Sequence, residues 1–187
     1  ACASPGGKTT ALAASAPGSR IVAADVRSRR MALLARTVAL SGADNVWLVQ
    51  ADLLAPLPLR VPFDCVIVDA PCSGLGTLRR DPDIRWRRSA ADLPGFAAAQ
   101  RQMLQHAGAI VGPRGRLVYA TCSSEPEENE DVAAAFLAAA PDFTPVHAGR
   151  VHPDLPPALV DERGHLRTRP DLHGLEAFFG AVFERRG

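Results

Sequence analysis

The sequence lacks several features that would assign it to other classes of protein. No apolar run approaches the roughly 20 residues that a membrane-spanning helix needs, and no basic segment followed by an apolar one opens the chain. Its cysteines form no Cys-x-x-Cys pair, and its five histidines show no metal-ligand spacing. We therefore expect a cytoplasmic protein with unbridged thiols and no metal, rather than a membrane protein, a zinc knuckle or a disulfide scaffold.

A strong charge of either sign is also absent. The formal net charge of +1 neither favours nor excludes nucleic acid, because a binding surface needs only a local basic stripe. Such a stripe is present, and it consists of Arg79, Arg80, Arg85, Arg87 and Arg88, with Trp86 among them. These side chains could hold RNA phosphates, although an arginine run is more commonly a solvated face.

The order of apolar runs predicts an α/β fold. At 187 residues, 47% of them hydrophobic, the chain is long enough for one domain with a buried core. Short β-rich runs alternate with helical patterns, which is typical of a mostly parallel sheet with helices on both faces. We expect strands at 20–25, 46–50, 63–69, 116–120 and 178–184, the last suited to an antiparallel pair. Helices are expected at 8–16, 29–40 and 97–111, and from a capping box at Ser124 to 140, whereas 141–170 reads mostly as loop with a short strand near Phe143.

The chain opens in a glycine-rich strand-to-helix turn, so we expect the strand before this turn to be missing. A Walker A loop needs glycine five positions before Gly7, where Cys2 stands, and the dinucleotide fingerprint Gly-x-Gly-x-x-Gly is also absent. S-adenosylmethionine has no phosphate and needs only close backbone contacts at the start of a helix. A nonspecific glycine turn is the alternative.

Carboxylates at three successive strand ends favour the S-adenosylmethionine interpretation. Asp25 lies 18 positions after Gly7 and could accept both hydroxyls of a ribose. Asp52 follows the next strand, where it could meet the adenine amino group, and Asp69 ends the strand after that. Ligands of open α/β sheets bind at this edge, although any one of these residues alone would more commonly be a turn or cap aspartate.

Two cysteines follow two different strand ends, in Pro-Cys-Ser-Gly at Cys72 and in Thr-Cys-Ser at Cys122. A thiol in such a place suggests covalent chemistry. A thiolate that adds to carbon 6 of a pyrimidine allows carbon 5 to accept a methyl group, after which a proton leaves carbon 5 and the thiol is expelled. Spacing does not decide which cysteine attacks. Cys65, inside FDCVIVD, instead fits a small core residue.

Five segments resemble the Sun (Fmu, RsmB) family of RNA cytosine-C5 methyltransferases. They are ACASPGGKT, AADVRSRRM, the AD of VQAD, DAPCSGLGTLRRDPDIRW and LVYATCSSEPEENEDV, and they span Ala1 to Val132. The resemblance implies a Rossmann-like, S-adenosylmethionine-dependent catalytic domain over 1–187, without the upstream RNA-binding domain. It also implies a monomer that methylates carbon 5 of cytosine in RNA, with ribosomal RNA as the expected substrate.

The same resemblance implies residue roles. The cofactor would be held by Cys2, Ala3, Ser4, Pro5, Gly6, Gly7 and Lys8, together with Asp25, Asp52 and Asp69. Cys122 would attack carbon 6, Cys72 would assist release of the product, and Asp69 could also contact the cytosine ring. The acids that follow Cys122 should raise a thiol pKa, and the start of the next helix should oppose them.

The family pattern also bears on two further segments. Its Pro-Asp-x-Arg-Trp favours an active-loop role for Asp83, Arg85 and Trp86. In its closing motif, at 173–179, Glu176 and Ala177 stand in place of Asp-Gly. Two other functions compete with methylation: a NAD-type Rossmann enzyme with structural cysteines, and an RNA-binding fragment without activity.

Overall fold

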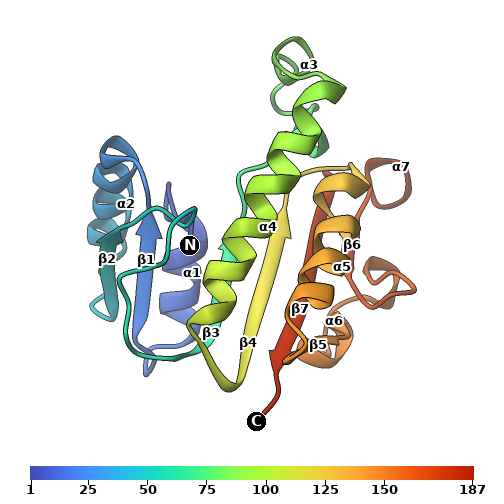
Figure 1. Ribbon diagram of the computed structural model, residues 1–187. Helices are drawn as coiled ribbons and strands as arrows, with labels where there is room; N and C mark the ends of the chain where they lie inside the picture. Colours follow the sequence, from blue (N-terminus) through green and yellow to red (C-terminus); the bar gives the residue numbers. More distant parts are fainter. The chain divides into compact units, whose positions relative to one another are not determined.

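The computed structural model describes residues 1–187 as two compact units, Ala1–Pro58 and Leu59–Gly187. Helices and strands alternate along the chain in both (Figure 1), as the α/β class requires. None of the helices combines the length and apolar character that crossing a bilayer would take.

The amino-terminal unit is built on a two-stranded parallel sheet. Its elements are α1 (Gly7–Ser15), β1 (Ile21–Asp25), α2 (Ser28–Ser41) and β2 (Val46–Gln50). Leu34 and Val38 of α2 form a small core with Ala23 of β1. Gly42 ends α2 in the left-handed conformation, with φ at 70°. All four elements lie within a few residues of their predicted positions.

The second unit holds a five-stranded sheet. Its strands are β3 (Phe63–Asp69), β4 (Val111–Thr121), β5 (Phe143–Val146), β6 (Leu166–Thr168) and β7 (Phe178–Arg185). Its helices are α3 (Ile84–Arg87), α4 (Leu93–Ala109), α5 (Glu130–Ala139), α6 (Ala148–Val151) and α7 (Pro170–His173). The strand order is β3-β4-β7-β5, with β6 also paired to β7. Only β3 and β4 are parallel here, because β7 pairs antiparallel with β4, β5 and β6, so antiparallel pairing is more extensive than expected.

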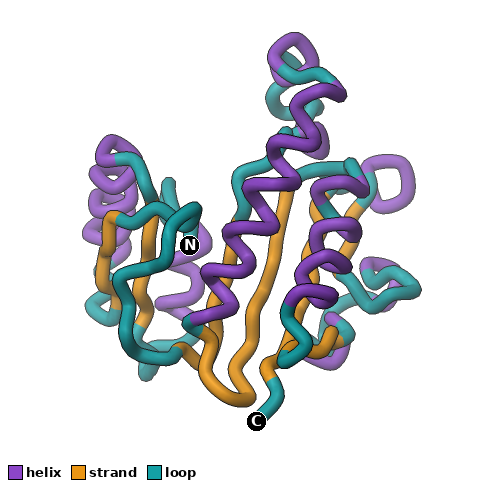
Figure 2. Tube along the Cα trace, in the orientation of Figure 1, coloured by secondary structure: helices purple, strands orange, loops and turns teal.

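Buried aromatic side chains join β4 and β7 to α5. Tyr119, Phe179 and Phe183 are at most 2% exposed, and the ring of Phe136 lies 4.9 Å from that of Phe183. Full burial of one such side chain is worth roughly 1.5–3 kcal/mol. Helices α4 and α5 run side by side (Figure 1), and the loops after β3 and β4 leave the sheet at the same end (Figure 2). The core therefore fixes where these two loops begin.

Three local predictions are wrong. Ser124 does not cap a helix: its hydroxyl bonds to Glu125, residues Pro126–Glu128 form a short 3₁₀ turn, and α5 begins only at Glu130. The helix is interrupted because Glu128 turns inward to a neighbouring loop. The segment expected to be mostly loop contains β6 and α6 besides the predicted strand at Phe143. Cys65 is exposed rather than buried, because it lies on β3 at an edge of the five-stranded sheet.

Candidate active site

The glycine-rich turn at the start of α1 requires glycine at Gly6. This residue has φ at 110°, and a Cβ there would lie 3.0 Å from Leu34 Cδ1 and 3.1 Å from Thr37 Cβ. No side chain caps the helix, and its first turn carries no acidic residue. The amide groups at the start of α1 thus suit an anionic group such as a carboxylate.

Asp25 is bound to this turn within the amino-terminal unit. Its side chain is 3% exposed, and Oδ2 accepts a hydrogen bond of 3.1 Å from the Ser4 amide. Arg30 lies beside both, with Nε 3.9 Å from Asp25 Oδ2 and Nη2 3.4 Å from the Ser4 carbonyl. The other oxygen, Oδ1, has a long contact of 3.5 Å with the Arg27 amide and retains acceptor capacity. The structure therefore brings together two predicted parts of the cofactor site.

Asp52 follows β2 at the same end as Asp25. The Ala51 amide donates to the Asp25 carbonyl at 3.1 Å, so the chain enters this turn beside the end of β1. The exposed carboxylate of Asp52 accepts a bond of 2.9 Å from the Leu54 amide, as turn aspartates do. Asp69 ends β3 in the second unit, so its expected place beside the other two stays a prediction.

Cys72 and Cys122 lie together in the second unit. Asp69 of β3 is in register with Ala120 of β4, and the Ala70 amide donates to the Ala120 carbonyl at 2.9 Å. The two cysteines follow these paired ends, and their sulfurs are 3.3 Å apart. Both residues are partly buried, and neither forms a disulfide. The structure thus unites the two thiols that the sequence places 50 positions apart.

The hydrogen bond between the sulfurs controls the protonation of Cys72. This bond to Cys122 and burial raise the pKa of the Cys72 thiol well above its ordinary value. Cys72 therefore keeps its proton at neutral pH. No cluster of three or more His, Cys, Asp or Glu side chains has the arrangement of a metal site.

Gly76 joins the loops that carry the two cysteines. Its amide donates to the Cys122 carbonyl at 3.0 Å, and its carbonyl accepts from the Ala177 amide at 3.0 Å. A Cβ at Gly76 would lie 2.2 Å from the Ala177 oxygen and 2.7 Å from the Cys122 oxygen. The closing motif at 173–179 thus contributes through its backbone, and the departure at Glu176 and Ala177 leaves this contact intact.

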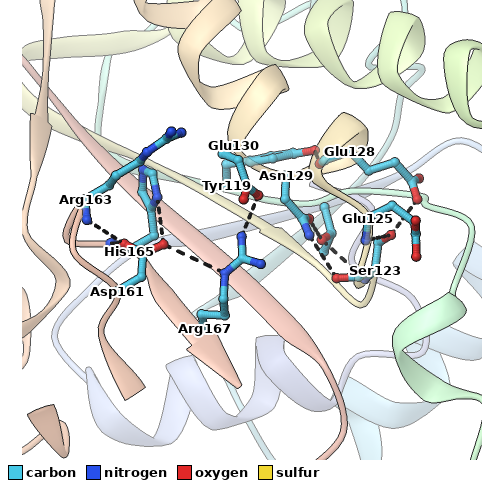
Figure 3. Close-up of polar contacts among 11 residues, drawn as sticks. Tyr119, Ser123, Glu125, Glu128, Asn129, Glu130, Asp161, Arg163, His165 and Arg167 are labelled. Carbon is cyan, nitrogen blue, oxygen red and sulfur yellow. Dashed lines mark hydrogen bonds and ion pairs between the residues drawn. The ribbon is translucent and has the colours of Figure 1, made fainter. Parts of the chain in front are cut away.

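A buried polar network around Glu128 was missed by the sequence argument. Glu128 is 0% exposed, and its carboxylate accepts bonds from Ser73 and Ser123, the residues that follow the two cysteines. Figure 3 shows the side chains of Glu128 and Asn129 directed at Ser123. The one signal in the sequence was the repeated Cys-Ser pair, because each serine supplies a hydroxyl to the same acid.

The arginine stripe divides into three groups, of which the first, Arg79 and Arg80, contacts Gly174 and Glu176 of the closing motif. Arg88 contacts the Pro-Cys loop, with Nε 3.2 Å from the Ser73 carbonyl and its guanidinium 5.0 Å from the centre of the Phe96 ring. Asp83, Arg85 and Trp86 are exposed, Trp86 to 82%, and the Arg85 guanidinium lies over the Trp86 ring. The contact with the loop is therefore made by Arg88 rather than by the three residues that the family pattern suggested.

Comparison with known proteins gives these features a family context. The profile of the family described as 16S rRNA methyltransferase RsmB/F matches residues 1–184. The ribosomal RNA small subunit methyltransferase B of Sodalis glossinidius (strain morsitans) is 43% identical over 143 residues, which are 75% of this chain and 33% of that protein. The chain thus spans about a third of the length of this curated relative.

Solved structures share the fold. The crystal structure of PH0851 superposes with a TM-score of 0.87 at 35% identity, over 98% of this chain and 41% of that one. NSun6 from Pyrococcus horikoshii, solved with SFG, gives a TM-score of 0.82 at 26% identity, over 99% of this chain and 46% of that one. The predicted α/β, Rossmann-like methyltransferase fold is confirmed by these matches.

Proposed function

We infer that this chain, which belongs to the RsmB/F family of 16S rRNA methyltransferases, transfers a methyl group from S-adenosylmethionine to carbon 5 of cytosine in ribosomal RNA. The observation that carries the proposal is the contact of 3.3 Å between the sulfurs of Cys72 and Cys122 at two adjoining strand ends. A pyrimidine carbon 5 needs a thiol to activate it and benefits from a second group to complete the reaction. The name of the Sodalis relative supports ribosomal RNA as the substrate.

Cys122 is the proposed nucleophile. Its thiolate forms a bond to carbon 6, and the electron pair of the carbon 5–carbon 6 double bond moves to carbon 5, which takes up the methyl group. A water molecule then accepts the proton from carbon 5, and the electron pair of that C–H bond restores the double bond as the bond between carbon 6 and the Cys122 sulfur breaks and releases the thiolate. The cytosine must be flipped out of its stack to reach this sulfur.

Cys72 is proposed to act as the protonated partner. Because its pKa is raised by the Cys122 sulfur and by burial, it can donate its S–H to a Cys122 thiolate. The assignment of attack to Cys122 and of product release to Cys72 rests on the family resemblance, because either sulfur can be the donor in their contact. Asp69, three residues before Cys72, is proposed to hold the N3 or amino edge of the cytosine.

The turn at Cys2–Lys8 fits S-adenosylmethionine, which supplies a methyl group on a sulfonium when bound. The uncapped start of α1 is suited to the carboxylate of its methionine part, and the buried Asp25 beside Ser4 is suited to its ribose. Asp52, in the adjoining turn, is proposed to meet the adenine amino group. The backbone amides and carboxylates that the cofactor requires are therefore present in the amino-terminal unit.

Asp25→Asn should weaken the binding of S-adenosylmethionine by about 10-fold to 100-fold, because an amide replaces the acceptor of a charge-assisted bond. Calorimetric titration with the cofactor, without RNA, measures the effect. Asp44→Asn, which changes an exposed aspartate of the same unit, is the matched control and should bind normally. A folded Asp25 variant with unchanged affinity would show that Asp25 only anchors Ser4.

The exposed pair of Arg85 and Trp86 is proposed to contact the RNA. An aromatic ring with a guanidinium over it offers a stacking surface for an unpaired base, and arginine also meets phosphates. Arg88 is assigned instead to the Pro-Cys loop, where it binds the Ser73 carbonyl.

RNA carrying 5-fluorocytosine tests the proposed reaction. Fluorine at carbon 5 cannot leave as a proton does, so the adduct should persist after methyl transfer and should migrate as a protein–RNA complex in denaturing gels. It should require S-adenosylmethionine, and RNA with unmodified cytosine, the matched control, should give turnover without a stable adduct. RNA binding without methyl transfer or adduct would instead support the non-catalytic alternative, and binding of NAD(H) in place of S-adenosylmethionine would support the dehydrogenase-type alternative.

A further inference from the structure

We propose that Glu128 is a positioning residue that holds the sulfurs of Cys72 and Cys122 in register by binding both of their loops through one buried carboxylate. The inference rests on the proposed function for its catalytic consequence. Its structural part, that Glu128 sets the distance between the two thiols, can be tested without methyl transfer.

One carboxylate oxygen of Glu128 binds both loops, and the other binds the Pro-Cys loop and helix α4. Oε2 accepts the hydroxyls of Ser73 at 2.5 Å and Ser123 at 2.6 Å. Oε1 accepts the Ser73 amide at 2.8 Å and Gln100 Nε2 at 3.0 Å. Because Ser73 follows Cys72 and Ser123 follows Cys122, each bond fixes the residue next to a sulfur. The two hydroxyls also lie 3.2 Å from each other.

The groups around the Glu128 carboxylate all donate hydrogen bonds to it. Two of these four donors are serine hydroxyls, one is a backbone amide and one is a side-chain amide. Gln100 also donates to the Pro71 carbonyl at 3.0 Å, while its own Oε1 is buried without a hydrogen-bond partner. The side-chain amide of Gln100 therefore uses its two hydrogens, one for the Pro-Cys loop and one for Glu128, while its oxygen has no partner.

The backbone of Glu128 is held as firmly as its side chain. The hydroxyl of Tyr119, which is 0% exposed, donates to the Glu128 carbonyl. Asn129 accepts from the Thr121 hydroxyl at 2.5 Å and donates to the Ser123 carbonyl at 3.0 Å. Thr121 and Ser123 flank Cys122, so this segment, drawn in Figure 3, fixes the nucleophile loop from both sides. It also explains why α5 starts only at Glu130.

Substitution of Glu128 separates a positioning role from a role in proton transfer. Glu128→Gln keeps the length and the acceptor facing Ser73, and the serine hydroxyls can turn to accept from its amide. Glu128→Asp keeps the charge but is one methylene shorter and cannot reach both loops. If Glu128 positions the thiols, kcat should fall by less than about 10-fold in Glu128→Gln and by roughly 100-fold in Glu128→Asp and Glu128→Ala, the scale of a displacement near 1 Å, with KM for RNA little changed. Recovery by Asp rather than Gln would indicate a base and would overturn the proposal.

A trivalent arsenical measures the sulfur pair directly. Phenylarsine oxide forms two As–S bonds to two adjacent thiols and releases water, so its affinity depends on how well the thiols are held together. We expect affinity to fall at least about 10-fold in Glu128→Ala and to stay near normal in Glu128→Gln. Cys72→Ala should lose bridged binding. Glu130→Gln is the control, because it changes a neighbouring acid that forms an ion pair with Arg167. This variant should bind the arsenical as the parent protein does.

The outcomes separate this inference from the proposed function. Normal arsenical affinity in a folded Glu128→Ala overturns the inference, whatever happens to methyl transfer. Altered affinity in a protein that methylates no RNA upholds the inference and counts against the proposed function. If Glu128→Ala does not fold, the double variant Ser73→Ala with Ser123→Ala removes the two hydroxyl donors and leaves the acid, and it should weaken arsenical binding in the same direction.

Discussion

We expect Cys122→Ala to abolish methyl transfer, with a loss of about 10,000-fold or more, the scale on which removal of a covalent nucleophile acts. Alanine cannot add to carbon 6, so carbon 5 stays unreactive toward the methyl donor. The same variant should form no adduct with RNA that contains 5-fluorocytosine. Rates are measured by transfer of a labelled methyl group, and adducts by denaturing electrophoresis.

Cys72→Ala should behave differently, and the contrast assigns the roles. The adduct should still form, because the Cys122 sulfur is present, and it should accumulate even with ordinary cytosine if release depends on Cys72. Cys65→Ala changes a thiol that is exposed on β3, and it should leave the rates of methyl transfer and of adduct formation unchanged. An adduct that survives the loss of Cys122 and disappears without Cys72 would reverse the assignment.

The strands that lead into the candidate site, and the ends they present, could be predicted from sequence because each contains a short apolar run with polar or proline residues after it. β2 and β3 have the predicted bounds, Val46–Gln50 and Phe63–Asp69. Two cysteines that follow parallel strands must leave the sheet at the same edge. Their proximity was therefore within reach of sequence reasoning, although the distance between their sulfurs was not.

The contacts that hold these loops could not be predicted, because they depend on residues distant in sequence. Glu128 looks like part of a helical first turn, yet it binds Ser73, 55 positions earlier, and tertiary bonds override the local capping pattern at Ser124. Arg88 likewise differs from the neighbouring arginines in having the Ser73 carbonyl and Phe96 within reach. The short elements between 147 and 173 carry too few residues for a period to be visible.

Both side-chain and backbone hydrogen bonds hold the two cysteine loops in place. Glu128 binds the residues just after the sulfurs, whereas Gly76 binds the Cys122 carbonyl directly and connects it to Ala177 before β7. β7 is in turn paired with β4, the strand that ends before Cys122. Backbone hydrogen bonds therefore connect the Cys122 loop through Gly76 and Ala177 to β7, and through β7 back to β4. A substitution at Gly76 should affect both the stability of the fold and the geometry of the cysteine pair.

Gly76→Ala should be the most disruptive single methyl group in the second unit. Its Cβ would lie 2.2 Å from the Ala177 oxygen, and because that atom belongs to the backbone, the loop must move away. Overpacking of this kind costs about 3 kcal/mol of unfolding free energy, and the displaced Pro-Cys loop should lower methyl transfer by roughly 100-fold. Urea denaturation and methyl-transfer rates measure the two effects.

Gly95→Ala is the matched control: nothing lies within 4 Å of its Cβ position in α4, so it should stabilise the protein by up to about 1 kcal/mol and leave the rate unchanged. Equal behaviour of the two variants would mean that the contact between Gly76, Cys122 and Ala177 does not hold the loops.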